Sequence, residues 1–152
     1  MKIITQNKKV YHDYEVLDTI EAGLVLTGDE VKSLRAGHVN LVGSFATMHQ
    51  GELFLINCQI TPYSKAYTKS DEAARRSRKL LLHRREITRL SNEIAQKGIT
   101  IVPIKLYFTP KSKIKVELGV CKHKKAADRK KEIKERDIKK ETQRELKKVY
   151  RY

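Results

Sequence analysis

Apolar residues alternate with polar ones at several places along the chain, and a two-residue period predicts β-strands. In residues 11–26 the apolar positions include Tyr14, Val16 and Ile20, so we predict a strand there. Gly23 interrupts its second half. A glycine inside a strand pattern predicts a bulge or a bend that curves the sheet.

The next strands are expected to form a hairpin. Residues 44–49 and 52–57 flank Gln50-Gly51, a dipeptide suited to a tight turn. We expect the second of these strands to continue to Ile60, because Pro62 then ends it.

A second pair of strands shows the clearest alternation. Apolar residues occupy the even positions of 102–108 and of 114–120, and a turn at 109–112 joins the two segments. On the last strand we expect Lys113, Lys115 and Glu117 to face outward.

A short helix is predicted over residues 28–36. Thr27 and Glu30 stand at the spacing of a capping box, and Gly37 can take the left-handed conformation that ends a helix. Val31 and Leu34 should point into a core, while three polar residues, Lys32, Ser33 and Arg35, should lie on the open face.

A second helix follows a loop at 63–74 and a cationic run at 75–79. Leu80, Ile87, Leu90 and Ile94 mark one apolar face, and Gly98 ends the helix. Short strands, two helices and a bulge indicate a mainly β fold with helices. A small closed antiparallel barrel of the oligonucleotide-binding type and a strand-rich α+β sandwich both satisfy the pattern.

The charge of the chain indicates its class of partner, and the distribution of that charge indicates two parts. The chain has 33 lysines and arginines against 18 acids, a formal charge of +15, which indicates a polyanionic partner. Residues 122–152 hold few apolar side chains and carry 14 of the cations against 6 acids. We therefore predict a folded domain over 1–121 and a basic tail over 122–152, disordered when free and helical when bound. A solvated tail that only aids solubility is the alternative.

The sequence shows no arrangement of residues typical of catalysis, so we predict that the protein is not an enzyme and needs no cofactor or metal. The five histidines are scattered, and Cys58 and Cys121 form no metal-type or redox pair, as expected in the cytoplasm. No segment predicts a secretory signal or a membrane span. Lysine, arginine and tyrosine side chains that suit phosphates and unpaired bases remain, which favours structured RNA as the partner.

Five motifs resemble those of the small protein B (SmpB) family of bacteria. They are EAGL (21–24), GDEVKSLR (28–35), ITPY (60–63), RKLLLH (78–83) and LYF (106–108), in order and with intact spacing. The resemblance implies an oligonucleotide-binding barrel with two to three packed helices. It also implies an adaptor that binds the tRNA-like domain of transfer-messenger RNA (tmRNA) and delivers it to stalled ribosomes in trans-translation.

The resemblance also implies which residues face RNA. At matching positions these are Asn7, Glu21, Lys32, Ser33, Arg35, Tyr63, Leu81 and Lys115, and the basic RKLLLH motif adds Arg78, Lys79 and His83. Glu21 is no phosphate ligand: it is expected to accept from a base amino group or a ribose hydroxyl, to orient neighbouring cations, or to form a structural ion pair. Leu81 is expected either to pack on RNA or to join the core.

For the tail, the resemblance implies contact with the ribosomal decoding centre and a helix in the empty mRNA channel. The corresponding residues are Lys122, His123, Lys124, Lys125, Asp128, Arg129 and Lys130. The chain departs from the family where it has His123 for a glycine and Ala127 for an aromatic residue. The implied partners are tmRNA, the 16S and 23S rRNA of the ribosome and, indirectly on the same RNA, elongation factor Tu. The protein is expected to be a monomer that does not bind membranes.

Composition alone leaves two other classes open. A ribosomal structural protein would also combine a basic globular body with an extension that threads rRNA. An RNA-processing hydrolase would need metal-dependent turnover, and no ligand cluster in the sequence suggests one.

Overall fold

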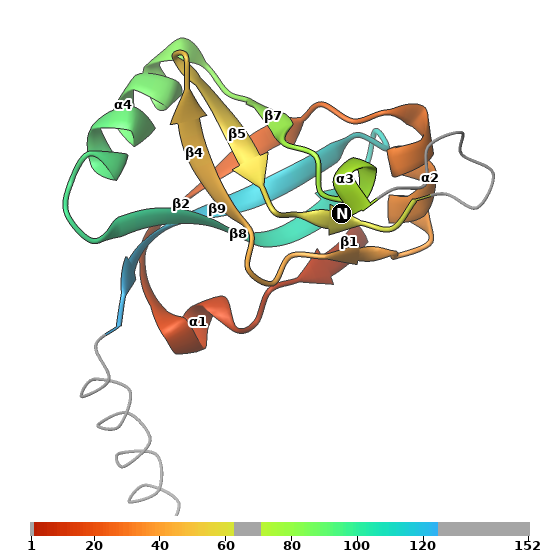
Figure 1. Ribbon diagram of the computed structural model, residues 1–152, viewed down its shortest axis with the longest axis horizontal. Coiled ribbons are helices and arrows are strands. Elements are labelled where there is room, and N and C mark those ends of the chain that lie inside the picture. Colours follow the sequence, from red (N-terminus) through yellow and green to blue (C-terminus); the bar gives the residue numbers. More distant parts are fainter. Residues whose placement is uncertain (1, 63–70, 125–152) are drawn as a thin grey trace, which may run out of the picture.

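A computed structural model describes residues 2–62 and 71–124 (Figure 1). It is mainly β. The strands are β1 (Lys2–Gln6), β2 (Tyr14–Leu24), β3 (Val39–Asn40), β4 (Phe45–His49), β5 (Glu52–Ile56), β6 (Gln59–Ile60), β7 (Arg78–Leu81), β8 (Ile99–Phe108) and β9 (Ile114–His123). The helices are α1 (Val10–Asp13), α2 (Gly28–Arg35), α3 (Asp71–Ala74) and α4 (Arg84–Ile94). None of these helices is long and apolar enough to cross a bilayer.

The main sheet is antiparallel, with the strand order β1-β8-β4-β5-β7-β2-β9. Strand β9 also pairs with β8, so the hydrogen-bonded neighbours form a ring from β8 through β4, β5, β7, β2 and β9 back to β8. Within this ring, β4 and β8 pair through one residue pair, Ala46 and Ile101. Its interior holds the main hydrophobic core, in which Leu53, Leu55 and Leu106 are fully buried.

The predicted hairpin is confirmed. Strands β4 and β5 pair up to His49 and Glu52, and the turn residues Gln50 and Gly51 have φ of 50° and 78°. Positive φ at both central residues is the requirement of the tight turn that matches the twist of a hairpin. The chain departs from the prediction after Ile56, because β6 is a separate strand that pairs with β3.

The paired strands β8 and β9 are also confirmed, but the even positions of β8 do not all face one side. A register shift lies between Pro103 and Lys105. Because the extra residue reverses the alternation, Leu106 packs in the main core whereas Ile104 packs with Val10 and Cys121 in a second cluster.

Strand β2 differs from its prediction at both ends. Tyr11 lies in the short helix α1, and at the start of this helix the N–H of Val10 donates to the Asn7 carbonyl. The bulge lies between Val16 and Asp18, whereas Gly23 pairs regularly with both neighbouring strands. Of the bulge or bend predicted at Gly23, the bulge was therefore wrong.

Both predicted helices exist, with corrections. The Thr27–Glu30 capping box forms, and Gly37 has φ of 77° just beyond α2. Ser33 is only 2% exposed, so it does not lie on the open face with Lys32 and Arg35. Leu80 belongs to β7 and not to α4, which begins after His83.

The two cysteines are predicted to be unreactive in the native protein. Cys58 and Cys121 are buried with no accessible surface, and burial raises the pKa of each thiol to about 11. At pH 8 we expect negligible reaction with Ellman's reagent until denaturant is added, after which both thiols react. Rapid modification of either thiol in the folded protein would contradict this burial.

Candidate nucleic-acid interface

Four of the predicted RNA-facing residues meet in one groove. The groove encloses about 470 Å³. It is lined by Glu21 of β2, Leu81 of β7, Lys115 of β9 and His83 at the start of α4, together with Leu82 and Glu86. Strand pairing brings them together, because β2 lies between β7 and β9 in the sheet.

Gly23 of β2 lies between two residues of this groove. It is paired with Leu81 on one side and with Lys115 on the other. A Cβ at position 23 would stand 3.2 Å from the Cβ of Leu81 and 3.7 Å from Nζ of Lys115. The absence of a side chain therefore keeps the space between the leucine and the lysine open.

The two sides of the groove differ in chemistry. Leu81 is 50% exposed, an apolar surface on which a base or ribose can pack. Nζ of Lys115 makes no hydrogen bond or ion pair with residues 2–62 or 71–124. The neighbouring cation Lys105, in contrast, pairs with Glu117 at 3.3 Å. Lys115 thus remains available to an anionic or hydrogen-bond-accepting ligand.

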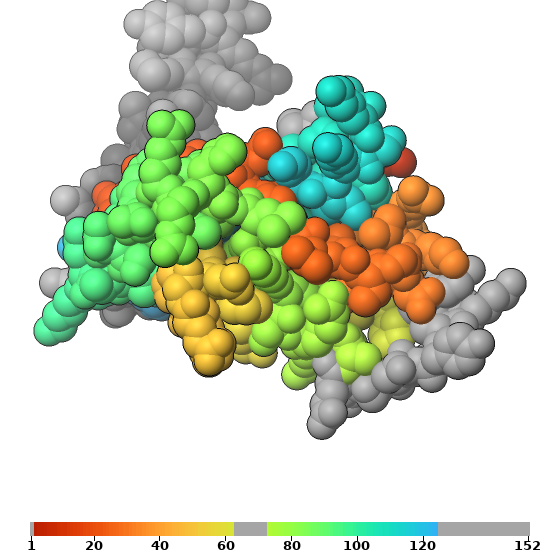
Figure 2. Space-filling model, turned by 90° about the horizontal axis from the view of Figure 1, so that it is seen from above, coloured from red at the N-terminus to blue at the C-terminus, as the bar shows by residue number. Residues whose placement is uncertain are grey.

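More cations lie on the same side of the molecule. In Figure 2, α2 (orange) lies beside the β8–β9 turn (cyan), and the two segments also lie together in Figure 1. Lys32 and Arg35 are exposed on α2, as are Lys111 and Lys113 at the turn. A phosphate backbone crossing from the groove to α2 would meet positive charge along its path.

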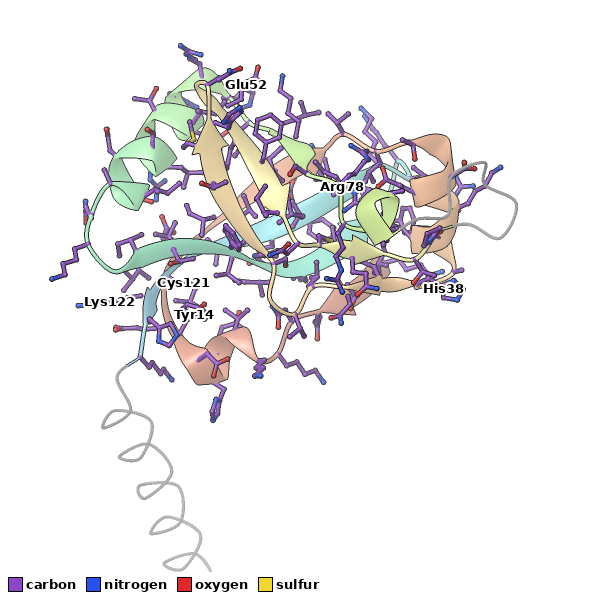
Figure 3. The ribbon with its side chains drawn as sticks, in the orientation of Figure 1. Tyr14, His38, Glu52, Arg78, Cys121 and Lys122 are labelled. Atoms are coloured by element: carbon purple, nitrogen blue, oxygen red, sulfur yellow. The ribbon has the colours of Figure 1, made fainter. Side chains whose placement is uncertain are left out.

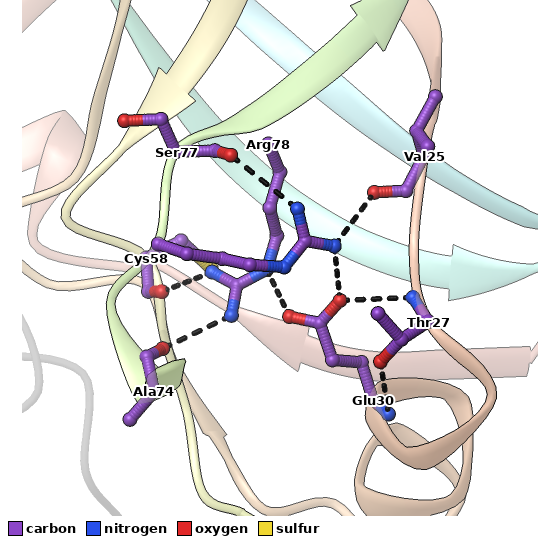
Figure 4. Close-up of polar contacts among 8 residues, drawn as sticks. Val25, Thr27, Glu30, Cys58, Ala74, Ser77 and Arg78 are labelled. Carbon is purple, nitrogen blue, oxygen red and sulfur yellow. Dashed lines mark hydrogen bonds and ion pairs between the residues drawn. The ribbon is translucent and has the colours of Figure 1, made fainter. Parts of the chain in front are cut away.

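A buried ion cluster holds α2 against the sheet (Figure 4). Glu30 accepts hydrogen bonds from the N–H of Thr27, from Arg76 and, at 2.5 Å, from Nε of Arg78. Arg78 also donates to the carbonyls of Cys58 at 2.6 Å and of Ala74 at 3.0 Å. One carboxylate and two guanidinium groups therefore join α2, α3, β7 and the β5–β6 connection.

The electrostatics of the cluster favour an ionised Glu30. Burial alone would raise its pKa, but hydrogen bonds from Arg76, Thr27 and Arg78, with the charge of Arg78, hold the pKa below its ordinary value. Arg78 has no exposed surface and all its contacts are internal. Arg78 therefore has a structural position and, contrary to the prediction, does not present its guanidinium at the surface.

The other predicted RNA-facing residues lie outside the groove. Asn7 is 5% exposed and its amide donates to the Leu41 carbonyl at 3.4 Å, so it supports the β3–β4 connection. Lys79 forms an ion pair with Glu52 at 3.0 Å. Ser33 is buried in α2. Tyr63 lies outside the described residues.

The predicted start of the tail is part of the folded body. Strand β9 continues past Cys121 through His123, whose ring packs edge-on against Tyr14 at a centroid distance of 4.9 Å. Lys124 then donates from its backbone to Asp13 and from Nζ to Tyr11, each at 3.0 Å. Figure 3 shows Tyr14 and Lys122 together near α1. Lys125, Asp128, Arg129 and Lys130 lie outside the described residues.

Sequence reasoning missed two features of this region. It read Glu30 as a helix cap and found no sign of its guanidinium partners. It treated the tyrosines as surfaces for unpaired bases and did not foresee that Tyr107 is 5% exposed, with its hydroxyl donating to Glu21. Neither contact leaves a local signal, because each joins distant segments. Among the described residues no group of three or more His, Cys, Asp or Glu side chains could hold a metal ion.

Comparison with known proteins gives one consistent result. A family model described as SmpB protein matches residues 4–148. An SsrA-binding protein of Coprothermobacter proteolyticus is 46% identical over 95% of this chain and 97% of its own length. One of Caldicellulosiruptor bescii is 48% identical over 99% of this chain and 94% of its own. A solved structure described as "tmRNA-SmpB: a journey to the center of the bacterial ribosome" is 51% identical, with a TM-score of 0.67 over 80% of this chain and 85% of that chain.

Proposed function

The chain belongs to the SmpB family, and from this premise we propose that it binds the tRNA-like domain of tmRNA and delivers it to stalled ribosomes. The observation that carries the proposal is the groove. Glu21, Leu81, His83 and Lys115, named as RNA-facing from the family resemblance, come from separate elements and line one surface. The protein acts as an adaptor without an enzymatic activity of its own, in the cytoplasm where ribosomes translate.

The ring of strand pairings supports assigning the fold to a closed barrel of the oligonucleotide-binding type. In such barrels the outer face of the sheet carries the ligand. The groove lies on that face, because its residues alternate with core residues: Lys115 is followed by the buried Val116, and Glu21 by the buried Ala22. The barrel thus supplies a rigid support for RNA contacts.

The protein has two parts in this proposal. The body, whose last described strand extends to His123, holds the tRNA-like domain, and the basic tail contacts the decoding centre and the mRNA channel. Because Lys124 is bonded to α1, the division between the parts comes after Lys124 and not after Cys121. The 12 lysines and arginines of residues 125–152 suit an rRNA surface.

The function is tested by RNA binding in rising salt. We expect the full chain to bind a minimal tRNA-like RNA more tightly than an unrelated hairpin of equal length at every salt concentration, because phosphate contacts alone do not discriminate between RNAs. A chain ending after Lys124 should keep this preference and lose the ability to support peptidyl transfer on a stalled ribosome. Equal affinity for both RNAs would refute the proposal, and full rescue by the shortened chain would refute the division into two parts.

A further inference from the structure

Glu21 carries a negative charge on the surface that this protein is proposed to offer to RNA. A carboxylate repels phosphate, so it can favour RNA only by accepting hydrogen bonds from nucleotide donors. Those donors are base N–H groups and the ribose 2′-hydroxyl. Glu21 is exposed and lines the groove with Leu81 and Lys115, where such a nucleotide would lie.

Strand register makes the charge of Glu21 costly in the free protein. Glu21 stands directly opposite Glu117 across β2 and β9. Like charges in such a pair destabilise a sheet. Glu117 is compensated by Lys105, but Glu21 has no ion pair within the described part of the chain. An uncompensated carboxylate at this position is consistent with a role in binding.

Tyr107 controls how that carboxylate is presented. Its hydroxyl donates to Oε2 of Glu21 from strand β8, across the intervening β9. Burial raises the pKa of Tyr107, and the carboxylates of Glu21 and Glu117 raise it further, so the phenol keeps its proton at physiological pH. Tyr107 is itself held in place, since it is 5% exposed and its ring lies 5.8 Å from Nζ of Lys105.

From this geometry we propose that Tyr107 is a positioning residue for RNA recognition, which rests on the function proposed above. By binding Oε2, Tyr107 directs Oε1 of Glu21 to accept a hydrogen bond from an unpaired nucleotide in the groove. Lys115 supplies a donor to the same nucleotide, and Leu81 packs on its apolar face. The ligand is therefore a nucleotide that offers a donor beside an acceptor, as the exposed edge of an unpaired base does.

The test is a double-mutant cycle with Tyr107→Phe and Glu21→Gln, using the tRNA-like RNA and the unrelated hairpin. Removing the hydroxyl should weaken binding of the tRNA-like RNA about tenfold, because one charge-assisted hydrogen bond is no longer oriented. Binding of the hairpin should not change. The salt dependence should also stay the same, since no charge is removed. In the Glu21→Gln background, Tyr107→Phe should have little further effect, because the carboxylate it orients is gone.

Tyr11→Phe is the matched control. Tyr11 is 56% exposed on α1, outside the groove, and the substitution removes the same hydroxyl group. The RNA affinity of this variant should therefore equal that of the original protein. Unfolding measurements on all variants separate positioning from stability. A purely structural role would weaken both RNAs together, or would add fully to the effect of Glu21→Gln, and either result would overturn the inference while leaving the proposed function standing. If the unmodified protein shows no preference for the tRNA-like RNA, the function and the inference fail together.

Discussion

Replacing Arg78 with alanine is expected to lower the free energy of unfolding by about 3–5 kcal/mol, the usual cost of breaking a buried ion pair from one side. Without the guanidinium, Glu30 keeps Arg76 as its one ionic partner among residues 2–62 and 71–124, and the carbonyls of Cys58 and Ala74 lose the Arg78 donor. Domains of this size are stable by about 5–15 kcal/mol, so the loss is a large share of the total. Urea unfolding followed by circular dichroism measures it.

Two further variants make this result interpretable. Arg75→Ala removes an exposed cation from the same run and should change stability by less than about 0.5 kcal/mol. Arg78→Lys should fall between, because a lysine can pair with Glu30 but cannot reach both carbonyls with a planar fork. If the alanine variant does not fold, the lysine variant supplies the comparison. A loss below about 1 kcal/mol for Arg78→Ala would show that the cluster contributes little.

Replacing Lys115 with glutamate is expected to weaken binding of the tRNA-like RNA by about tenfold to a hundredfold. The change removes the one unpaired cation of the described groove and adds a carboxylate to the groove that already contains Glu21. Filter binding or fluorescence anisotropy at fixed salt measures the affinity. Because one cation at the RNA-facing surface is lost, the salt slope should also fall by about one unit.

The control for Lys115→Glu is Lys97→Glu. Lys97 is exposed in the connection between α4 and β8, does not line the groove, and gives the same change in net charge. Its effect on affinity should be small. Equal weakening by both variants would mean that overall charge, and not the groove, controls binding.

Several features of the fold were predictable because their signals are local. The capping box joins Thr27 to Glu30, and the hairpin turn at Gln50 and Gly51 depends on two adjacent residues. Strand β9 keeps a strict alternation over 114–120 because no bulge interrupts it. In each case the residues that cause the structure lie within a few positions of one another, so the sequence displays them together.

The bulges and the short helix α1 were not predictable on the same grounds. A bulge adds one residue to one strand, as between Val16 and Asp18, and leaves the composition of the strand unchanged. A helix of one turn, as over Val10–Asp13, is too short to show a helical period.

For the candidate site, the sequence and its family resemblance identified Glu21, Leu81, His83 and Lys115 but could not show how they are related in space. Arg78 reaches Glu30 across 48 positions, and Tyr107 reaches Glu21 across 86. The pairing order β7-β2-β9 forms the groove, and the same packing buries Arg78 while leaving Lys115 open. Local hydrogen bonds and the periodicity of apolar side chains depend on neighbouring residues, so the sequence determines them by itself. The burial of a side chain and the partners of a charged group depend on which distant strands pair, so only the tertiary structure decides them.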